Sequence, residues 1–374
     1  MAAAALSALP YEPHEALAER PHVMVDGAAR PSSVLTLSHW PQSPTPAFLA
    51  RDVSAASVLE YVRLAASGGA GGGFSRAARP LREALAAGAA AEAVTNDHFD
   101  EDGLMSVFAL VDPATALGKR RLIEAVATCG DFGVVSEEEV ARIAFAIAPL
   151  AESEAGAGSG TSERYQATLP RLSELLEHPG RFERFWAAEA MELAAGRAAI
   201  ERGEVVITEH GDLDLAVVAR QRGRPGARIP GAGGGLPVHA AAVHSLTPAS
   251  RVVAFDGEWC ECYLRYEGWV RTVSRRVPLR PDLAPLAIRL TAEEPSGAEW
   301  EANGVGAIVA RLRPAGEGRT EMAPSRIVTL VREYLASADP AWDPWRRGGG
   351  YIPMTERAGY RASYGGGRRR RGRA

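Results

Sequence analysis

The sequence is poor in cysteine and in lysine. Three cysteines, Cys129, Cys260 and Cys262, occur among 374 residues, and Lys119 is the only lysine. Three unevenly spaced cysteines do not build a disulfide framework, and no second Cys/His pair stands at the spacing of a zinc site. This scarcity favours a reducing compartment, so we expect a cytoplasmic protein.

Long apolar runs are missing as well. No stretch of about 18 uninterrupted apolar residues occurs, which excludes a helix that spans a membrane. The start of the chain lacks the basic region and apolar run of a secretory signal. The formal net charge is -4, which provides no general attraction to nucleic acid or to an anionic membrane. We therefore expect no membrane partner, and the composition leaves the oligomeric state open, a homodimer included.

Three common catalytic motifs are also absent. The sequence contains no G-x-x-x-x-G-K-[ST] phosphate loop, no G-x-G-x-x-G after a strand and no G-x-S-x-G turn. Each of these patterns positions a backbone for phosphate, dinucleotide or acyl chemistry. Kinase, dehydrogenase and esterase functions therefore lose their main support.

The first 150 residues alternate between strand and helix patterns. Apolar, β-branched residues predict strands over 34–38 and 91–97, and helical spacing of apolar residues predicts helices over 50–66, 119–129 and 137–150. Strands that alternate with helices predict a parallel sheet flanked by helices. We expect an α/β metal-site domain over residues 20–150.

The pattern changes in the second half of the chain. Residues 151–202 read as a linker with connecting helices. Short strands with two helical segments, 283–293 and 325–337, predict a smaller α+β domain over 203–337 that binds substrate or an anion. The remainder, 338–374, is rich in Gly, Arg and aromatic residues without periodicity. It predicts a disordered basic tail.

One charged stretch precedes a helix in the first half. "HFDEDG" places His98, Asp100 and Asp102 at alternate positions and follows them with Gly103. In an extended loop, residues two apart point the same way, so the three side chains can share one cation. Imidazole and carboxylate ligands suit Mn, Fe or Zn better than calcium. The following helix N-terminus favours an anionic ligand such as phosphate.

Two other interpretations of this stretch are possible from its residue types. As a calcium-binding EF-hand loop it fails, because His98 takes the first ligand position and Ala109 stands where a bidentate Glu is needed. As a capped loop it is satisfactory, because Asp97, Asp100 and Asp102 are good caps and turn formers ahead of a helix. The sequence leaves the metal site and the capped loop as alternatives.

The string "HFDEDGLMS" resembles the first motif of the DHH phosphoesterase superfamily, H-x-D-x-D-G-x-x-S, with Ser106 also in place. The resemblance implies that His98, Asp100 and Asp102 bind manganese and that a two-metal centre activates water against a phosphodiester or pyrophosphate. For the later bridging aspartate of that family, Asp131 is the counterpart, and His39 is the candidate for a missing imidazole. The Asp-His-His triplet of the family does not occur. The whole chain resembles an uncharacterised bacterial family in "RYEGWV" and "RPDLAPLA".

Substrate contacts are expected from the second half. His239 and His244 follow the Gly-rich run 225–237, which would suit a substrate loop, and we assign them a substrate contact. Aromatic and basic residues alternate over 263–276 and predict a strand pair on which Arg275 and Arg276 bind an anion. The competing interpretations are core histidines and a sheet with its arginines in solvent.

Three functions follow from these patterns. The first is a metal-dependent phosphoesterase-like hydrolase in which Mn2+, as one or two ions, is held by His98, Asp100, Asp102, Asp131 and His39, with Asp100 and Asp102 as catalytic residues and Ser106 contacting substrate. The second is a catalytically inactive protein of similar fold that binds a nucleotide or nucleic acid. The third is a structural protein without a ligand. A phosphorylated small molecule or short nucleic acid is the expected partner of the first two.

Overall fold

The computed structural model of the chain describes residues 8–67, 78–221 and 236–366. Contacts divide these residues into two units. The first unit comprises the described residues up to Met191 together with Thr272–Arg275, and the second comprises Glu192–Arg271 and the residues from Arg276 onward. The chain thus returns briefly to the first unit after it has begun the second.

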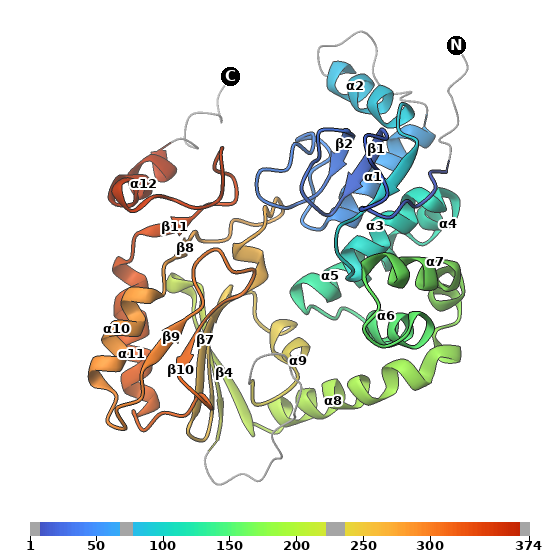
Figure 1. Cartoon of the computed structure of the whole chain (residues 1–374). Coiled ribbons are helices and arrows are strands. Elements are labelled where there is room, and N and C mark those ends of the chain that lie inside the picture. The colour runs from blue at the N-terminus through green and yellow to red at the C-terminus, as the bar shows by residue number, and fades with distance from the viewer. Residues whose placement is uncertain (1–7, 68–77, 222–235, 367–374) are drawn as a thin grey trace. The chain divides into compact units, whose positions relative to one another are not determined.

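The first unit contains a parallel sheet (Figure 1). Its strands are β1 (His22–Val25), β2 (Ser33–Leu37) and β3 (Ala93–Thr95), in the order β2-β1-β3. Both pairings are parallel, and every residue of the central strand β1 is buried. A short apolar strand that is buried along its whole length is typical of a sheet covered by helices. The predicted α/β class with a parallel sheet is confirmed.

Helices make up most of the rest of the first unit. They are α1 (Ser54–Ala66), α2 (Ala78–Ala89), α3 (Glu101–Val111), α4 (Pro113–Gly118), α5 (Arg120–Phe132), α6 (Glu138–Ala155) and α7 (Thr161–Glu177), followed by a short 3-10 turn (Pro179–Phe182) and α8 (Glu183–Glu201). Helices α1 and α3 pack against each other and against β1, and α5 packs on α3. These contacts bring the start of α3 and the end of α5 to the same region of the unit.

The segment that we expected to be a linker with connecting helices, 151–202, is divided between the units. Helix α7 packs against α6 and buries Leu172 and Leu175 there, so it belongs to the first unit. Helix α8 passes from the first unit to the second at Met191. Apolar residues on α7 are therefore core residues of the first unit.

The second unit is built on a mixed sheet (Figure 1). Its strands are β4 (Val205–His210), β5 (Leu215–Arg220), β6 (Arg251–Asp256), β7 (Trp259–Leu264), β10 (Ala310–Pro314) and β9 (Trp300–Ala302), in this spatial order. The pair β5–β6 is parallel and the other pairs are antiparallel. The remaining elements are two 3-10 turns (Gly211–Leu213 and Tyr266–Gly268), α9 (Ala240–His244), β8 (Arg280–Pro281), α10 (Ala284–Glu293), α11 (Pro324–Ser337), β11 (Pro340–Trp342) and α12 (Met354–Gly366).

Helices α10 and α11 lie side by side against this sheet (Figure 1). Leu286 and Leu290 of α10, with Ile327 and Leu330 of α11, pack into one cluster with apolar residues of the strands. Apolar residues at helical spacing explain both helices, and the predicted ranges 283–293 and 325–337 match them to within one residue. The second unit has the α+β arrangement that the sequence indicated.

One expectation for the second half requires correction. The alternating stretch 263–276 is not a strand pair, because β7 ends at Leu264 and a 3-10 turn follows. The buried Arg265 pairs with Glu267 at 2.7 Å and donates to the carbonyls of Thr247 and Ala249, which holds the chain outside the sheet. Within the segment 338–374, expected to be a tail, the structure describes β11 and α12, and 367–374 lie outside the described residues.

Most of the expected substrate loop, 225–237, lies in 222–235, outside the described residues. Within 8–67, 78–221 and 236–366, every helix is too short or too polar to cross a membrane.

Candidate metal centre

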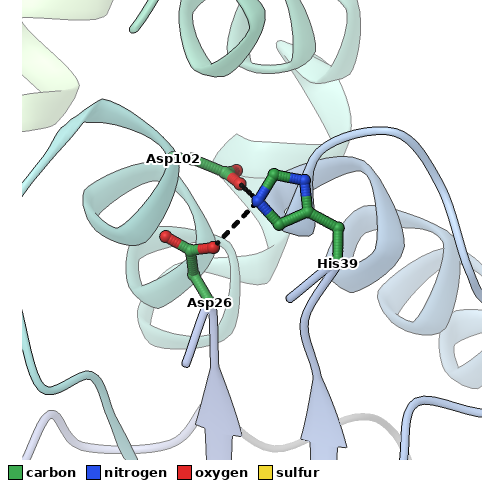
Figure 2. A group of neighbouring side chains, drawn as sticks. All are labelled: Asp26, His39 and Asp102. Atoms are coloured by element: carbon green, nitrogen blue, oxygen red, sulfur yellow. Dashed lines mark ion pairs between the residues drawn. The ribbon is translucent and has the colours of Figure 1, made fainter. Parts of the chain in front are cut away.

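The carboxyl ends of the three parallel strands converge on a group of acidic and imidazole side chains. Asp26 directly follows β1, and His39 comes two residues after β2 (Figure 2). The segment 96–100 follows β3. Ligands of open α/β sheets bind outside these strand ends, because loops from neighbouring strands meet there.

His39 is surrounded by three carboxylates. Its Nε2 lies 3.5 Å from Asp26 Oδ1, 3.8 Å from Asp102 Oδ2 and 3.4 Å from Asp131 Oδ2. Figure 2 shows the imidazole pointing at Asp26 and Asp102. Its Nδ1 lies 2.5 Å from the carbonyl oxygen of Asp52 and donates to it. In the neutral ring Nε2 then carries the lone pair, as it does in a histidine that ligates a metal.

A second group forms around His98. Its Nε2 lies 3.0 Å from Asp100 Oδ2 and 3.2 Å from Asp26 Oδ2, while its Nδ1 lies 2.9 Å from Asp97 Oδ1. Asn96 fixes this geometry, because its side chain donates to the carbonyl of Asp26 and accepts from the backbone N–H of His98. The amide thus holds the ends of β1 and β3 together.

Asp26 belongs to both groups. Potential ligand atoms of Asp26, His39 and Asp102 lie within 4.8 Å of one another, and the same holds for Asp26, His98 and Asp100. The two carboxylate oxygens of Asp26 face different imidazoles. Each group could therefore hold one metal ion, and Asp26 would be shared between the two.

The alternation of His98, Asp100 and Asp102 does not produce one three-residue group. Helix α3 begins at Glu101, so Asp100 is its N-cap and accepts from the backbone N–H of Gly103 at 2.8 Å. Asp102 already lies in the first helical turn and points elsewhere, because residues two apart in a helix lie on different faces. The expectation of an extended loop was wrong from Glu101 onward, and the capping role of Asp100 is confirmed.

Asp102 instead caps a different helix. Its two carboxylate oxygens accept from the backbone N–H groups of Ser54 and Ala55, both at 2.7 Å. The N-cap residue of α1, Val53, has no side-chain acceptor, so Asp102 replaces it. The hydroxyl of Ser54, the first residue of α1, donates to Asp26.

Asp131 comes from the far end of α5. Its side chain is buried, and its Oδ2 accepts no hydrogen bond from the residues that the structure describes. Burial raises the pKa of this carboxyl well above its usual range, and the charges of Asp102 and Asp26 raise it further. A cation could satisfy this buried carboxylate oxygen, which lies 3.4 Å from His39 Nε2.

The group as a whole is short of positive charge. Burial and the neighbouring carboxylates raise the pKa of Asp26 to about 6, and burial raises that of Asp102 to about 6 despite its backbone donors. Burial lowers the affinity of His98 for a proton, but its hydrogen bonds to Asp100, Asp26 and Asp97 outweigh this and raise its pKa. Buried carboxylates in contact require a compensating cation in order to ionise together.

The raised pKa of Asp26 sets the direction of a pH effect on the metal-free protein. The folded state retains a proton between the ordinary value of 3.8 and about 6, whereas the unfolded state has lost it. The stability from this group is therefore present below about pH 4 and is lost as pH rises through about 6. In EDTA, we expect Asp26→Asn to gain melting temperature relative to the wild type between about pH 4.5 and pH 7. A constant difference across this range contradicts the raised pKa.

The structure also places the predicted substrate-contact residues. Ser106 is buried in α3, and its hydroxyl has no hydrogen-bond partner among the described residues. Arg275 belongs to the short segment that returns to the first unit, whereas Arg276 belongs to the second. His239 caps α9 in the second unit, and His244 Nε2 lies 2.9 Å from the Tyr263 hydroxyl. Substrate contact by these side chains stays a prediction.

Sequence reasoning missed Asp26, the residue that both groups share. Its signal was available: "HVMVDG" is an apolar strand that ends in an acidic residue. The strand order made it central, because β1 lies between β2 and β3.

Fold and site define an α/β protein with a buried carboxylate and imidazole cluster at the carboxyl ends of a parallel sheet. The chain belongs to a family described as "Family of unknown function (DUF6687)", whose model matches residues 7–345. No curated protein matches the chain, and no solved structure matches it. The family match agrees with the expected uncharacterised family and gives no support to the DHH resemblance.

Proposed function

We propose that the protein is a metal-dependent phosphoesterase-like hydrolase that acts on a phosphodiester or a pyrophosphate. The observation that carries the proposal is the shared carboxylate of Asp26, with one oxygen toward His39 and the other toward His98. Shared carboxylates are characteristic of sites with two ions a few ångströms apart, and such sites favour displacement at phosphorus. Oxygen and imidazole donors suit Mn2+, which we propose as the ion.

The DHH resemblance supports the proposal through a few residues only. "HFDEDGLMS" supplies His98, Asp100 and Asp102, and the absent Asp-His-His triplet leaves one carboxylate and two imidazoles unassigned. Asp26 would supply the carboxylate and His39 one of the imidazoles, although both precede the motif in sequence. The proposal therefore rests on the arrangement of donors, with the motif as secondary support.

Bound divalent ions would supply water of lowered pKa and would offset the charge that develops on the phosphoryl oxygens. The protein's own residues set the geometry. Asp52 and Asn96 orient the imidazoles of His39 and His98 through hydrogen bonds to the ring Nδ1 and to the backbone, respectively. The backbone of α1 holds Asp102 in place.

Arg275 belongs to the first unit, as the carboxylate and imidazole cluster does. The carboxylate of Asp52 accepts from the backbone N–H groups of Val273 at 2.6 Å and Ser274 at 2.9 Å. The segment that contains Arg275 is thus held by the residue whose carbonyl orients His39. We propose that Arg275 contributes positive charge to the binding of the phosphoryl group.

Metal binding and turnover test the proposal together. We expect Mn2+ to raise the melting temperature of the EDTA-treated protein by mass action, and EDTA to reverse the effect. The Mn2+-loaded protein should release p-nitrophenol from bis-p-nitrophenyl phosphate. Metal binding without turnover on this substrate or on pyrophosphate favours the alternative, a protein that binds a nucleotide or nucleic acid. A melting temperature that does not respond to Mn2+, Fe2+ or Zn2+ refutes both.

A further inference from the structure

Tyr165 of α7 is a buried phenol that the proposed chemistry has not yet used. Its side chain is fully buried, and its ring stacks on Tyr11 with centroids 4.8 Å apart and meets the edge of Phe99 at 5.2 Å. Two aromatic neighbours on different sides fix the plane of the ring. The direction of the hydroxyl is therefore set by packing.

The hydroxyl of Tyr165 points at the start of α3. A Cβ atom added to Gly103 would lie 2.7 Å from this oxygen, 2.9 Å from Asn96 Nδ2 and 3.1 Å from Asp100 Oδ1. The phenol thus occupies space that only a glycine leaves open, next to the N-cap carboxylate of the second group. Tyr165 comes from a helix that sequence analysis did not connect with the site.

No described residue accepts or donates a hydrogen bond at this hydroxyl. A buried hydroxyl without a partner is unfavourable, and native structures rarely retain one unless a ligand or water completes it. Burial raises the pKa of Tyr165 well above its usual range, and the charges of Asp100 and Asp26 raise it further. The group therefore keeps its proton at neutral pH and acts as a donor.

The side chains beside the hydroxyl are open to solvent. His98 and Asp100 are 31% and 36% exposed, whereas His39 and Asp102 are completely buried. An anion from solution therefore reaches the group of Asp26, His98 and Asp100 first. Its oxygens would arrive next to the carboxylate that Tyr165 approaches.

We propose that Tyr165 donates a hydrogen bond to a phosphoryl oxygen of the substrate bound at the group of Asp26, His98 and Asp100. The inference rests on the proposed function and adds a substrate-binding residue to it. The Tyr165 hydroxyl is neutral and is not one of the proposed metal ligands. Its removal should therefore lower the affinity for the phosphoryl anion and leave the affinity for the metal ions unchanged. Ser106, with its own unpartnered hydroxyl on α3, is not required by the proposal.

Tyr165→Phe removes the hydroxyl and keeps the ring. With the Mn2+-loaded protein and inorganic phosphate as the probe, calorimetric titration should show phosphate binding weakened by about 10-fold to 100-fold, as expected for one hydrogen bond to a charged group. Mn2+ affinity should stay within about threefold of the wild type, because the metal ligands are unchanged. The metal-free variant should melt at the wild-type temperature or above it, because an unpartnered buried hydroxyl has been removed.

Tyr61→Phe is the matched control. Tyr61 is a buried tyrosine of α1 in the same unit, and its hydroxyl lies against Gly88 of α2. This variant should bind phosphate as the wild type does.

The outcomes separate the inference from the proposed function. Wild-type protein that binds Mn2+ and hydrolyses phosphodiester, with phosphate binding unchanged in Tyr165→Phe, overturns the inference and leaves the function intact. A large loss of Mn2+ affinity in Tyr165→Phe also overturns it, because the phenol then positions Asp100. Wild-type protein that takes up no divalent metal overturns both.

Discussion

Asp26→Asn is expected to abolish the effect of Mn2+ on melting temperature and to lower hydrolysis by about 10^3-fold, which corresponds to about 4 kcal/mol. The amide loses the negative charge and offers one oxygen instead of two. Both groups of side chains depend on that carboxylate, since its oxygens lie 3.5 Å from His39 Nε2 and 3.2 Å from His98 Nε2. Metal analysis and turnover of the purified variant check the result.

The loss of metal affinity or activity should depend on where the substituted aspartate lies relative to the site. The carboxylate of Asp97 contacts His98 at Nδ1 and so orients its ring. Asp97 is a member of neither of the two possible metal-binding groups. Asp97→Asn should therefore cost about 10-fold to 100-fold in metal affinity or activity, as is usual for residues that orient a ligand. Asp212→Asn, at an exposed position in the second unit, is the neutral control. Equal losses in all three variants would refute a shared carboxylate.

Arg280→Met is expected to destabilise the second unit by about 3–5 kcal/mol. Arg280 is 1% exposed, and its guanidinium donates to four backbone carbonyls, those of Leu264, Arg265, Ala307 and Ile308. Methionine matches much of the volume but donates no hydrogen bond to these oxygens. Burial lowers the pKa of Arg280 to about 9, so the side chain stays charged at neutral pH. The melting temperature of the Arg280→Met variant should fall by about 10 °C.

An exposed arginine in the same unit provides the control. Arg289 pairs with Glu333 at 2.9 Å, and both side chains are largely in solvent. Arg289→Met should change stability by less than about 0.5 kcal/mol, because exposed ion pairs contribute little. Similar losses in the two variants would show that the carbonyl contacts of Arg280 are not the cause.

The sequence predicted the positions of helices better than it predicted where the chain leaves a regular strand. Apolar spacing located α10 and α11 to within a residue, because burial of one helix face imposes that spacing. It failed over 263–276, where aromatic and basic residues alternate as in a half-buried strand. The arginines of that stretch are not all in solvent: Arg265 is buried, and so is Arg280 shortly after it. Charge patterns do not reveal which arginines satisfy backbone carbonyls inside a fold.

The candidate site was predictable in its residue types and not in its grouping. His39 and Asp131 were selected from the sequence, and the structure brings them to within 3.4 Å of each other. Asp102 was assigned to the wrong neighbours, since the start of α3 at Glu101 turns it toward α1. Asp26 and Tyr165 were overlooked because strand order and helix packing bring them to the site. Local spacing contains neither kind of information.

The hydrogen bonds of Asp52 bear on how the molecule can be dissected. A fragment that ends at Met191 would delete Val273 and Ser274, whose backbone donors that carboxylate accepts. The same truncation would remove Arg275 as well. It would leave the carboxylate of Asp52 without these two donors, and the carbonyl of Asp52 is the group that orients His39. Weak metal binding by such a fragment would therefore reflect an incomplete first unit, and complementation with a peptide that covers 272–275 would be the informative way to restore it.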